Sequence, residues 1–301
     1  MLPKLFIFRC ILIFSFSGLL SSCNFNKMFL RPDRYAADFK GFNINTPNDT
    51  LGVRFTPQTF QPTFTKHNGR DTVELNYTIE SVLFKSSNGN TLNGWFLKPI
   101  GLKADITILH LHGNAGSLVS QYKAMSPLTK NGFQILVFDY SGFGFSTGKS
   151  TRNSALKDAL SALDYIKARP DVANTKLVLY GQSFGGHLSA VVAEERQKDI
   201  DALVLEGAFS SAKDIGASMV PVLGRICVKQ GYCATRSIKH YTKPVMVIHS
   251  TEDKTVPFYM GQKLYDAANL PKQFYEIEKC HICGPRYYTD EITEKIKGML
   301  Q

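Results

Sequence analysis

Short apolar runs alternate with longer stretches of helical apolar spacing along residues 78–301. Runs without a polar face are typical of strands buried on both sides, and the stretches between them predict helices. Strands that alternate with helices build a mostly parallel sheet covered by helices on both faces, so we predict one α/β domain. The predicted strands occupy 105–111, 133–138, 177–180, 202–205, 244–248 and 273–277, and the predicted helices 118–130, 155–169, 188–195, 260–268 and 288–300.

Three segments depart from this alternation. Residues 78–85 and 91–97 alternate apolar and polar positions around an Asn-Gly turn, which predicts a β-hairpin at the start of the domain. Residues 23–77 scatter Pro, Asn, Thr and Phe without a clear period, which predicts a tether and an irregular N-terminal segment. Residues 208–243 interrupt the alternation of strands and helices, and long insertions of this kind tend to be functional, so we predict a short cap or lid there.

Residues 1–22 have the organisation of a secretion signal. Two positive charges precede an apolar run that is too short for a comfortable membrane span. Leu-Ser-Ser-Cys at 20–23 resembles the lipobox of bacterial lipoproteins, in which Cys23 is lipidated and becomes the first mature residue. This resemblance implies a membrane-anchored protein of the cell envelope, and Asn24 favours the outer membrane with the protein on its periplasmic face. An ordinary signal peptide or an uncleaved anchor is the alternative.

Composition narrows the classes of partner. Apolar residues make up 44% of the 301 residues and charged residues 20%, which is typical of a globular chain. The formal net charge of +10 could attract anionic lipid head groups or merely confer solubility. No run of Arg and Lys is interleaved with aromatic residues, so we expect no nucleic-acid partner.

The six cysteines divide unevenly along the chain. Cys10 would be removed with the signal segment, and Cys23 would carry the lipid. In an oxidising compartment the remaining four can form two disulfides in any of three pairings. Cys-His-Ile-Cys at 280–283 could instead hold zinc, but the other pair is spaced too loosely for a zinc knuckle, so we favour disulfides and expect no metal. The four candidates are Cys227, Cys233, Cys280 and Cys283.

The centre of the chain is Gly-Gln-Ser-Phe-Gly at 181–185, which fits the pattern G-x-S-x-G. In that pattern a strand turns sharply into a helix, and small residues let the backbone pass closely and leave the serine oxygen exposed. A predicted strand precedes the motif and a predicted helix follows it, as the pattern requires. We therefore predict that Ser183 is a nucleophile.

A serine hydroxyl is a weak nucleophile without a positioned base, and that base needs an acid to orient it. His281 lies just after a predicted strand, in a loop that can reach back over Ser183. Asp253 follows the strand at 244–248, in a loop where catalytic residues of such sheets collect. We predict a triad of Ser183, His281 and Asp253. Glu206, which ends an earlier strand, is the rival acid.

Acyl transfer also needs hydrogen-bond donors for the developing oxyanion. Phe184, the residue after the nucleophile, offers one backbone N–H. His-Gly-Asn-Ala at 112–115 follows the strand at 105–111 and offers the second donor. We predict that Phe184 and Asn114 form the oxyanion hole, with Ala115 as the alternative to Asn114.

These motifs together resemble the α/β-hydrolase superfamily, and within it the lysophospholipase and monoacylglycerol-lipase-like branch. Besides the two glycine-containing motifs already described, the chain matches Asp-Tyr-x-Gly-x-Gly-x-Ser at 139–146 and Thr-Glu-Asp-x-x-Val-Pro at 251–257. The order of serine, acid and late histidine along the chain is that of the family. Cys280 and Ile282 depart from it, because a small residue usually precedes the histidine and a polar one follows.

The resemblance implies the α/β-hydrolase fold and cofactor-free hydrolysis of carboxylic esters or thioesters through an acyl-enzyme. It points to lysophospholipids or monoacylglycerols as substrates, and it implies that Asp139 is structural. The same triad chemistry also supports a serine peptidase. A non-catalytic envelope scaffold is the hypothesis from another class.

Overall fold

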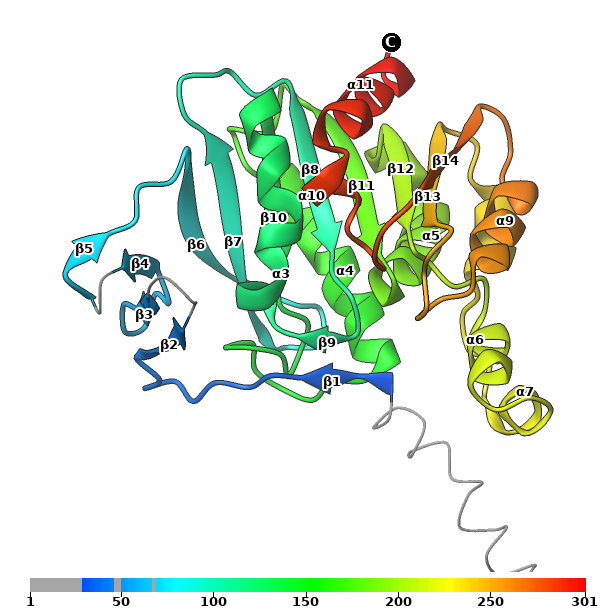
Figure 1. The fold of residues 1–301 in the computed structure, drawn as a ribbon, viewed down its shortest axis with the longest axis horizontal. Coiled ribbons are helices and arrows are strands. Elements are labelled where there is room, and N and C mark those ends of the chain that lie inside the picture. Colours follow the sequence, from blue (N-terminus) through cyan, green and yellow to red (C-terminus); the bar gives the residue numbers. More distant parts are fainter. Residues whose placement is uncertain (1–28, 46–49, 67–68) are drawn as a thin grey trace, which may run out of the picture.

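The computed structural model describes residues 29–45, 50–66 and 69–301, apart from the side chains of Asn45 and Cys227. The predicted signal segment 1–22 and the predicted lipidation site Cys23 lie outside the described residues. The centre of the fold is an eight-stranded sheet in the order β14-β13-β12-β11-β8-β10-β7-β6, with helices on both faces (Figure 1). Neighbours from β14 to β10 are parallel, and β7 is antiparallel to β10 and β6. The predicted mostly parallel α/β fold is confirmed.

Each strand predicted for the domain is present, and the first two form the predicted hairpin. The strands of the central sheet are β6 (Tyr77–Lys85), β7 (Thr91–Pro99), β8 (Ile106–Leu111), β10 (Phe133–Phe138), β11 (Lys176–Gln182), β12 (Ala202–Glu206), β13 (Val245–Ser250) and β14 (Lys272–Ile277).

The predicted helices are present with shifted ends. Helix α5 begins directly after Ser183, earlier than predicted, because its first turn consists of small residues and a histidine that show no apolar period. None of the helices in the described ranges is both long and apolar enough to cross a membrane. The helices that cover the sheet are α3 (Leu118–Met125), α4 (Arg152–Lys167), α5 (Phe184–Arg196), α9 (Phe258–Ala267), α10 (Gly284–Tyr287) and α11 (Thr289–Met299), with 3₁₀ turns at Ser126–Asn131 and Gln197–Asp199.

The insertion between β12 and β13 is helical. It contains α6 (Ala212–Met219), α7 (Leu223–Cys227), α8 (Ala234–Ser237) and a 3₁₀ turn at Ile238–His240. Helices α6 and α7 cross at two glycines, since a Cβ on Gly224 would lie 2.0 Å from the carbonyl oxygen of Gly216. The resulting α6–α7 hairpin projects from the body of the protein (Figure 1).

The continuous apolar runs of the sequence reflect helices on both sides of the sheet. Every residue of β8, β10 and β13 is buried. Successive residues of a strand point to opposite faces, so Ile108 and Leu109 of β8 belong to two different apolar clusters. A strand that is covered on both faces needs apolar residues at every position, which explains why these runs do not alternate.

The N-terminal segment is not irregular, and the prediction for 23–77 is wrong in this respect. Four short antiparallel strands form a second sheet, and its aromatic residues pack on the main domain. Phe55 lies 4.9 Å from Phe145 and Phe64 lies 6.1 Å from Trp95, measured between ring centroids. These strands are too short to show a period in the sequence. They are β2 (Gly41–Asn45), β3 (Thr50–Phe55), β4 (Pro62–Lys66) and β5 (Asp71–Thr72), while β1 (Arg31–Pro32) pairs with β9 (Ala115–Gly116).

The parallel strands bring the predicted site residues to one edge of the sheet. Parallel neighbours end at the same edge, so loops that are far apart in the sequence meet there. This carboxyl-end edge carries the loop that begins at His112 after β8, Ser183 after β11, Glu206 at the end of β12, Asp253 after β13 and His281 after β14.

Candidate active site

Ser183 occupies the turn between β11 and α5. Its backbone has φ 55° and ψ −115°, a conformation that costs a residue other than glycine on the order of 1–3 kcal/mol. Its N–H donates to the carbonyl oxygen of Glu206 at 2.9 Å, which ties the turn to β12. A strained serine on a rigid support is typical of a nucleophile whose oxygen is held above the sheet.

Two glycines of the motif allow this turn to lie so close to the sheet. A Cβ on Gly185 would lie 1.8 Å from the carbonyl oxygen of Leu111, and a Cβ on Gly181 would lie 2.4 Å from the carbonyl oxygen of Gly185. Both distances are far below van der Waals contact, so any larger residue would push α5 away from the end of β8. The glycines therefore hold Ser183 against the strand that leads into the predicted oxyanion loop.

Asp253 and His281 form a hydrogen-bonded pair, with Nδ1 of His281 2.6 Å from Oδ2 of Asp253. The Asp253 side chain is fully buried, and its Oδ1 accepts the N–H groups of Thr255 at 2.8 Å and Val256 at 2.9 Å. Burial alone would raise the pKa of Asp253, but hydrogen bonds from His249, His281 and the backbone hold this pKa well below its usual range. An ionised Asp253 thus fixes Nδ1 of His281 and leaves Nε2 available to another group.

His249 is a second partner of Asp253 that the sequence reasoning missed. Its buried ring places Nε2 2.9 Å from the carbonyl oxygen of Val256 and 3.4 Å from Oδ2 of Asp253. The ring is packed against α9, where a Cβ on Gly261 would lie 2.3 Å from Nδ1. The sequence did contain a signal for this contact. His249 lies at the end of a buried strand, four residues before Asp253.

The histidine loop closes over the serine turn. A Cβ on Gly207 would lie 3.0 Å from both Cε1 and Nδ1 of His281, so the ring rests on the chain that leaves β12. A Cβ on Gly113 would lie 3.8 Å from Cβ of Ser183 and 3.9 Å from Cδ1 of Ile282. Among the described residues the Ser183 hydroxyl makes no hydrogen bond to His281. Contacts of this kind often tighten only when substrate is bound.

The two predicted oxyanion residues lie at this edge, but the Asn114 side chain is engaged elsewhere. Phe184 is the first residue of α5, so its N–H has no partner inside the helix. Nδ2 of Asn114 donates to the carbonyl oxygen of Phe29 at 2.5 Å, and its own carbonyl oxygen accepts the N–H of Arg31 at 2.8 Å. Of the polar groups of Asn114, its backbone N–H thus remains the candidate oxyanion donor. Ala115, the alternative, stands opposite Arg31 in the register of β9 and β1, and this pairing leaves its N–H as a second candidate donor.

Glu206, the alternative acid, supports the histidine loop through hydrogen bonds. Its Oε1 accepts the N–H of Gly284 at 2.6 Å, and its Oε2 accepts two side-chain donors from β11 at 2.7 and 2.8 Å. One of these donors, Nε2 of Gln182, also lies 3.3 Å from the carbonyl oxygen of Ile282. Burial raises the pKa of Glu206. With both oxygens occupied, Glu206 holds the residues that follow His281 rather than the imidazole itself.

The remaining described histidines have structural surroundings. Burial lowers the pKa of His110 and His187 to about 3 and that of His112 to about 4, so all three are neutral near pH 7. His187 stacks on a phenylalanine ring at 4.2 Å between centroids. His240 is exposed in the insertion, beside Glu194 at 2.5 Å. His281 differs from these rings, because its side chain is partly exposed, is hydrogen-bonded to Asp253 and lies in the loop beside the serine turn.

The predicted disulfides of the described thiols are not formed. Cys233, Cys280 and Cys283 are free, and the side chain of Cys227 lies outside the described part of the chain. Sγ of Cys283 is 2.9 Å from the carbonyl oxygen of Cys280, and burial raises the pKa of Cys283 to about 12. A thiol hydrogen bond, rather than a covalent bridge, therefore spans the histidine loop.

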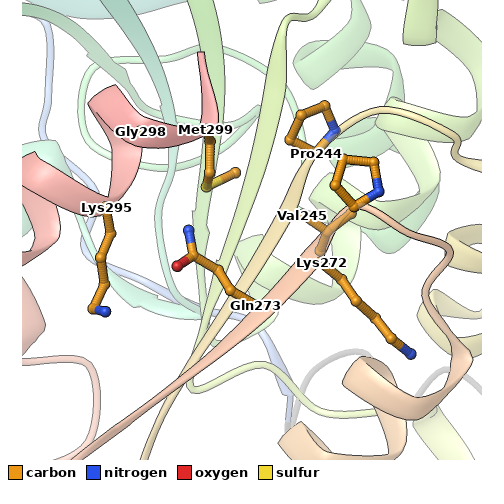
Figure 2. A pocket seen from close by; sticks show the side chains of 8 residues that line it. Pro244, Val245, Lys272, Gln273, Lys295, Gly298 and Met299 are labelled. Atoms are coloured by element: carbon orange, nitrogen blue, oxygen red, sulfur yellow. The ribbon is translucent and has the colours of Figure 1, made fainter. Parts of the chain in front are cut away.

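Two further features are relevant to the candidate active site: groups of metal-ligating side chains and the pocket of Figure 2. Across 29–45, 50–66 and 69–301, no three His, Cys, Asp or Glu side chains are grouped so that they could hold a metal ion. Figure 2 shows side chains that line a surface pocket, among them Val245, Lys272 and Lys295. This pocket has a volume of about 430 Å³. Val245 and Lys272 begin β13 and β14, so this pocket opens at the edge of the sheet opposite Ser183.

Comparison with known proteins agrees with the fold. Residues 106–225 match the family model described as the alpha/beta hydrolase fold. The uncharacterized protein YfhR of Salmonella typhi is 37% identical over 209 residues, which cover 64% of this chain and 71% of that protein. The lysophosphatidylserine lipase ABHD12 of Rattus norvegicus is 29% identical over 229 residues, 69% of this chain and 56% of the relative. The chain thus spans about half the length of that lipase.

Among solved structures, the Pyrococcus furiosus esterase Pf2001 superposes with a TM-score of 0.64 over 90% of this chain and 97% of its own, at 16% identity. A likeness at this identity shows the fold. An eight-stranded, mostly parallel sheet with a serine turn at its carboxyl-end edge defines an α/β hydrolase. The chain belongs to the α/β-hydrolase family, and its relatives support a hydrolase activity.

Replacing Asp253 by Asn should alter how stability depends on pH. Because the pKa of Asp253 is depressed in the folded state, its ionised form stabilises the fold above the unfolded value near pH 4, and this contribution is lost as the pH falls. We expect the free energy of unfolding of Asp253→Asn to fall furthest below wild type near neutral pH, with the gap narrowing below about pH 4. Urea titrations at several pH values measure the gap, and a pH-independent difference would contradict the depressed pKa.

Replacing Glu206 should destabilise the protein through unpaired donors. Glu206→Ala leaves the Gly284 N–H and two β11 donors buried without an acceptor, so we expect a loss on the order of 3 kcal/mol in the free energy of unfolding. Glu206→Gln keeps one acceptor oxygen and should lose less. Glu278→Ala, at an exposed carboxylate nearby, is the matched control. Equal losses for Glu206→Ala and Glu278→Ala in urea titrations would rule out the supporting role.

Proposed function

We propose that this protein is a serine hydrolase that cleaves carboxylic esters through an acyl-enzyme. Ser183 is the nucleophile, His281 the general base and acid, and Asp253 the residue that orients the histidine. The observation that carries the proposal is the 2.6 Å contact between His281 and a buried, ionised Asp253 at the edge of the sheet that also holds the strained Ser183 turn. No cofactor is needed for this chemistry.

In the proposed mechanism, Oγ of Ser183 attacks the ester carbonyl while Nε2 of His281 takes the hydroxyl proton. Asp253 stabilises the imidazolium that forms, because its carboxylate already accepts Nδ1–H. The backbone N–H groups of Phe184 and Asn114 bind the tetrahedral oxyanion. His281 then gives its proton to the departing alkoxide, which leaves an acyl-serine. A water molecule deprotonated by the same histidine hydrolyses the acyl-serine and restores the hydroxyl.

We assign the substrate to esters that carry one acyl chain, such as a lysophospholipid or a monoacylglycerol. Support comes from two similar proteins, one a lysophosphatidylserine lipase at 29% identity and the other an esterase of the same fold.

We further propose that the protein is a lipoprotein of the cell envelope, anchored through Cys23 on the periplasmic face of the outer membrane. The lipobox-like sequence at 20–23 and the apolar run before it support this assignment. The partner it implies is the membrane surface, and a net charge of +10 suits a surface of anionic lipids.

Replacing Ser183 should abolish ester hydrolysis. We expect Ser183→Ala to lower kcat/KM for p-nitrophenyl esters on the order of a thousandfold or more, since removing a triad serine leaves only binding and oxyanion contributions. Ser218→Ala, at an exposed position of α6, is the control and should retain wild-type turnover. Equal turnover by Ser183→Ala and wild type would refute the proposal.

A fluorophosphonate probe separates this proposal from its rivals. Only an activated serine reacts, so labelling should occur in wild type, map to Ser183 by peptide mass analysis and be absent from Ser183→Ala. Labelling without turnover of any ester would favour a peptidase of the same fold. No labelling of folded wild-type protein would favour a non-catalytic scaffold.

Replacing Asn114 should have a small effect compared with replacing Ser183. If the backbone N–H of Asn114 serves the oxyanion, Asn114→Ala removes only the side-chain hydrogen bond to Phe29, and we expect kcat to fall by less than about tenfold. Loss of a true oxyanion donor costs about 100- to 1000-fold in kcat. A loss of that size in a variant whose melting temperature is unchanged would assign the donor to the side chain.

A further inference from the structure

The α6–α7 hairpin displays large apolar side chains to solvent. Ile226 is 72% exposed and Val222 69%, and three further large apolar residues beside them are also exposed, namely Met219, Val220 and Leu223. Isolated exposed apolar residues are normal, but a cluster in one short projecting segment marks an interaction surface. The crossing glycines pack α6 on α7, so these side chains remain on the outside of the hairpin.

The surface beside the hairpin is basic. An open pocket of about 940 Å³ is bounded by α6, α8 and α9. One of its carboxylates, Asp214, is engaged by Lys263 at 3.3 Å and by Arg225 at 3.7 Å. Five cationic side chains line the pocket against two carboxylates: Lys213, Arg225, Arg236, Lys239 and Lys263 against Asp214 and Asp266. An apolar tip next to a net positive surface is complementary to anionic lipids.

The described chain begins beside the base of this hairpin. The ring of Phe29 packs at 5.7 Å on Phe184 and at 5.4 Å on Phe209, measured between centroids. Phe209 lies two positions before Ser211, the N-cap of α6. Cys23 is only six positions before Phe29, which is at most about 20 Å of extended chain. A lipid on Cys23 would therefore hold the carboxyl-end edge and the hairpin close to the bilayer.

We propose that the α6–α7 hairpin docks onto an anionic phospholipid bilayer. Its apolar side chains enter the boundary between head groups and acyl chains, and the basic pocket faces the lipid phosphates. The carboxyl-end edge then faces the membrane, so a lipid ester reaches Ser183 without crossing bulk water. The lipid anchor of the proposed function restricts the orientation, whereas the apolar and basic residues of the hairpin region supply the contact.

A second copy of this chain fits the same surface less well. A two-fold symmetric contact would place the same patch on both partners, so the basic pockets would meet each other. Like charges brought together oppose association unless anions separate them. An anionic bilayer satisfies both the apolar tip and the pocket, which favours it as the occupant.

A tryptophan placed on the hairpin tests this docking. Trp95 is the single tryptophan of the chain and is fully buried, so brominated lipid should hardly quench its emission. The full chain carrying Ile226→Trp is reconstituted in phosphatidylcholine vesicles with or without phosphatidylglycerol, and in matched vesicles of brominated lipid. Leu102→Trp is the control, because Leu102 is 53% exposed in the loop that precedes β8, at the opposite edge of the sheet.

We expect brominated lipid to quench the Ile226→Trp emission severalfold more than the Leu102→Trp emission, with a blue shift that grows with phosphatidylglycerol. Replacing both Arg236 and Lys239 by Gln should reduce the dependence on phosphatidylglycerol. Equal quenching at the two positions would overturn the proposal. A blue shift that depends on protein concentration without vesicles would overturn it in favour of a second copy.

These readouts are separate from those of the proposed function. Turnover of a water-soluble p-nitrophenyl ester and labelling of Ser183 do not enter the quenching measurement, and the hairpin residues are not part of the proposed triad. The mass of the N-terminal peptide reports lipidation of Cys23. Preferential quenching at position 226 without ester turnover would therefore refute the hydrolase proposal and support docking. Ester turnover with equal quenching at positions 226 and 102 would support the hydrolase and refute docking.

Discussion

The close passage of α5 over the end of β8 is the constraint on which the rest of the site depends. Gly185 touches the carbonyl oxygen of Leu111 so closely that no side chain fits between them. This contact forces the strained backbone at Ser183 and brings the start of α5 next to the loop that holds Asn114. A nucleophile and two candidate backbone donors thus share one compact corner, and the strain at Ser183 is sustained by the hydrogen bond of its N–H to β12.

The histidine loop is positioned by residues of neighbouring strands and by a contact within the loop itself. On one side Asp253 accepts Nδ1–H of His281, and Asp253 is itself fixed by His249 and two backbone N–H groups. On the other side Glu206 accepts the N–H of Gly284, and the Cys283 thiol contacts the carbonyl oxygen of Cys280. Strands β12, β13 and β14 therefore all contribute to where the imidazole lies. The side chain of Asp253 and the residue Glu206 are buried, which strengthens the hydrogen bonds they accept.

Local patterns were enough to predict the sheet and the serine turn from the sequence. Apolar runs and glycine spacing are local features, and they located β8, β11 and the turn at Ser183. The supporting contacts could not be predicted, because they join distant parts of the chain. Glu206 and Gly284 are 78 positions apart, and the role of His249 depends on how Asp253 folds back onto β13. The short N-terminal strands were missed because their stability comes from aromatic packing on another element.

The insertion has a consequence for how such a protein can diversify. It leaves the sheet after Glu206 and returns at Val245, and β12 and β13 are direct parallel neighbours held by their own hydrogen-bond ladder. The sheet therefore closes whatever the length or shape of the segment between them. The hydrogen bonds that orient His281 and its loop lie outside that segment, whereas Gly207 at its start packs on the imidazole ring. Evolution or protein engineering can therefore exchange the projecting α6–α7 hairpin as a module, retuning which molecules approach the serine, while the core residues at Ala234, Ile238 and Tyr241 keep the rest of the insertion packed on the domain.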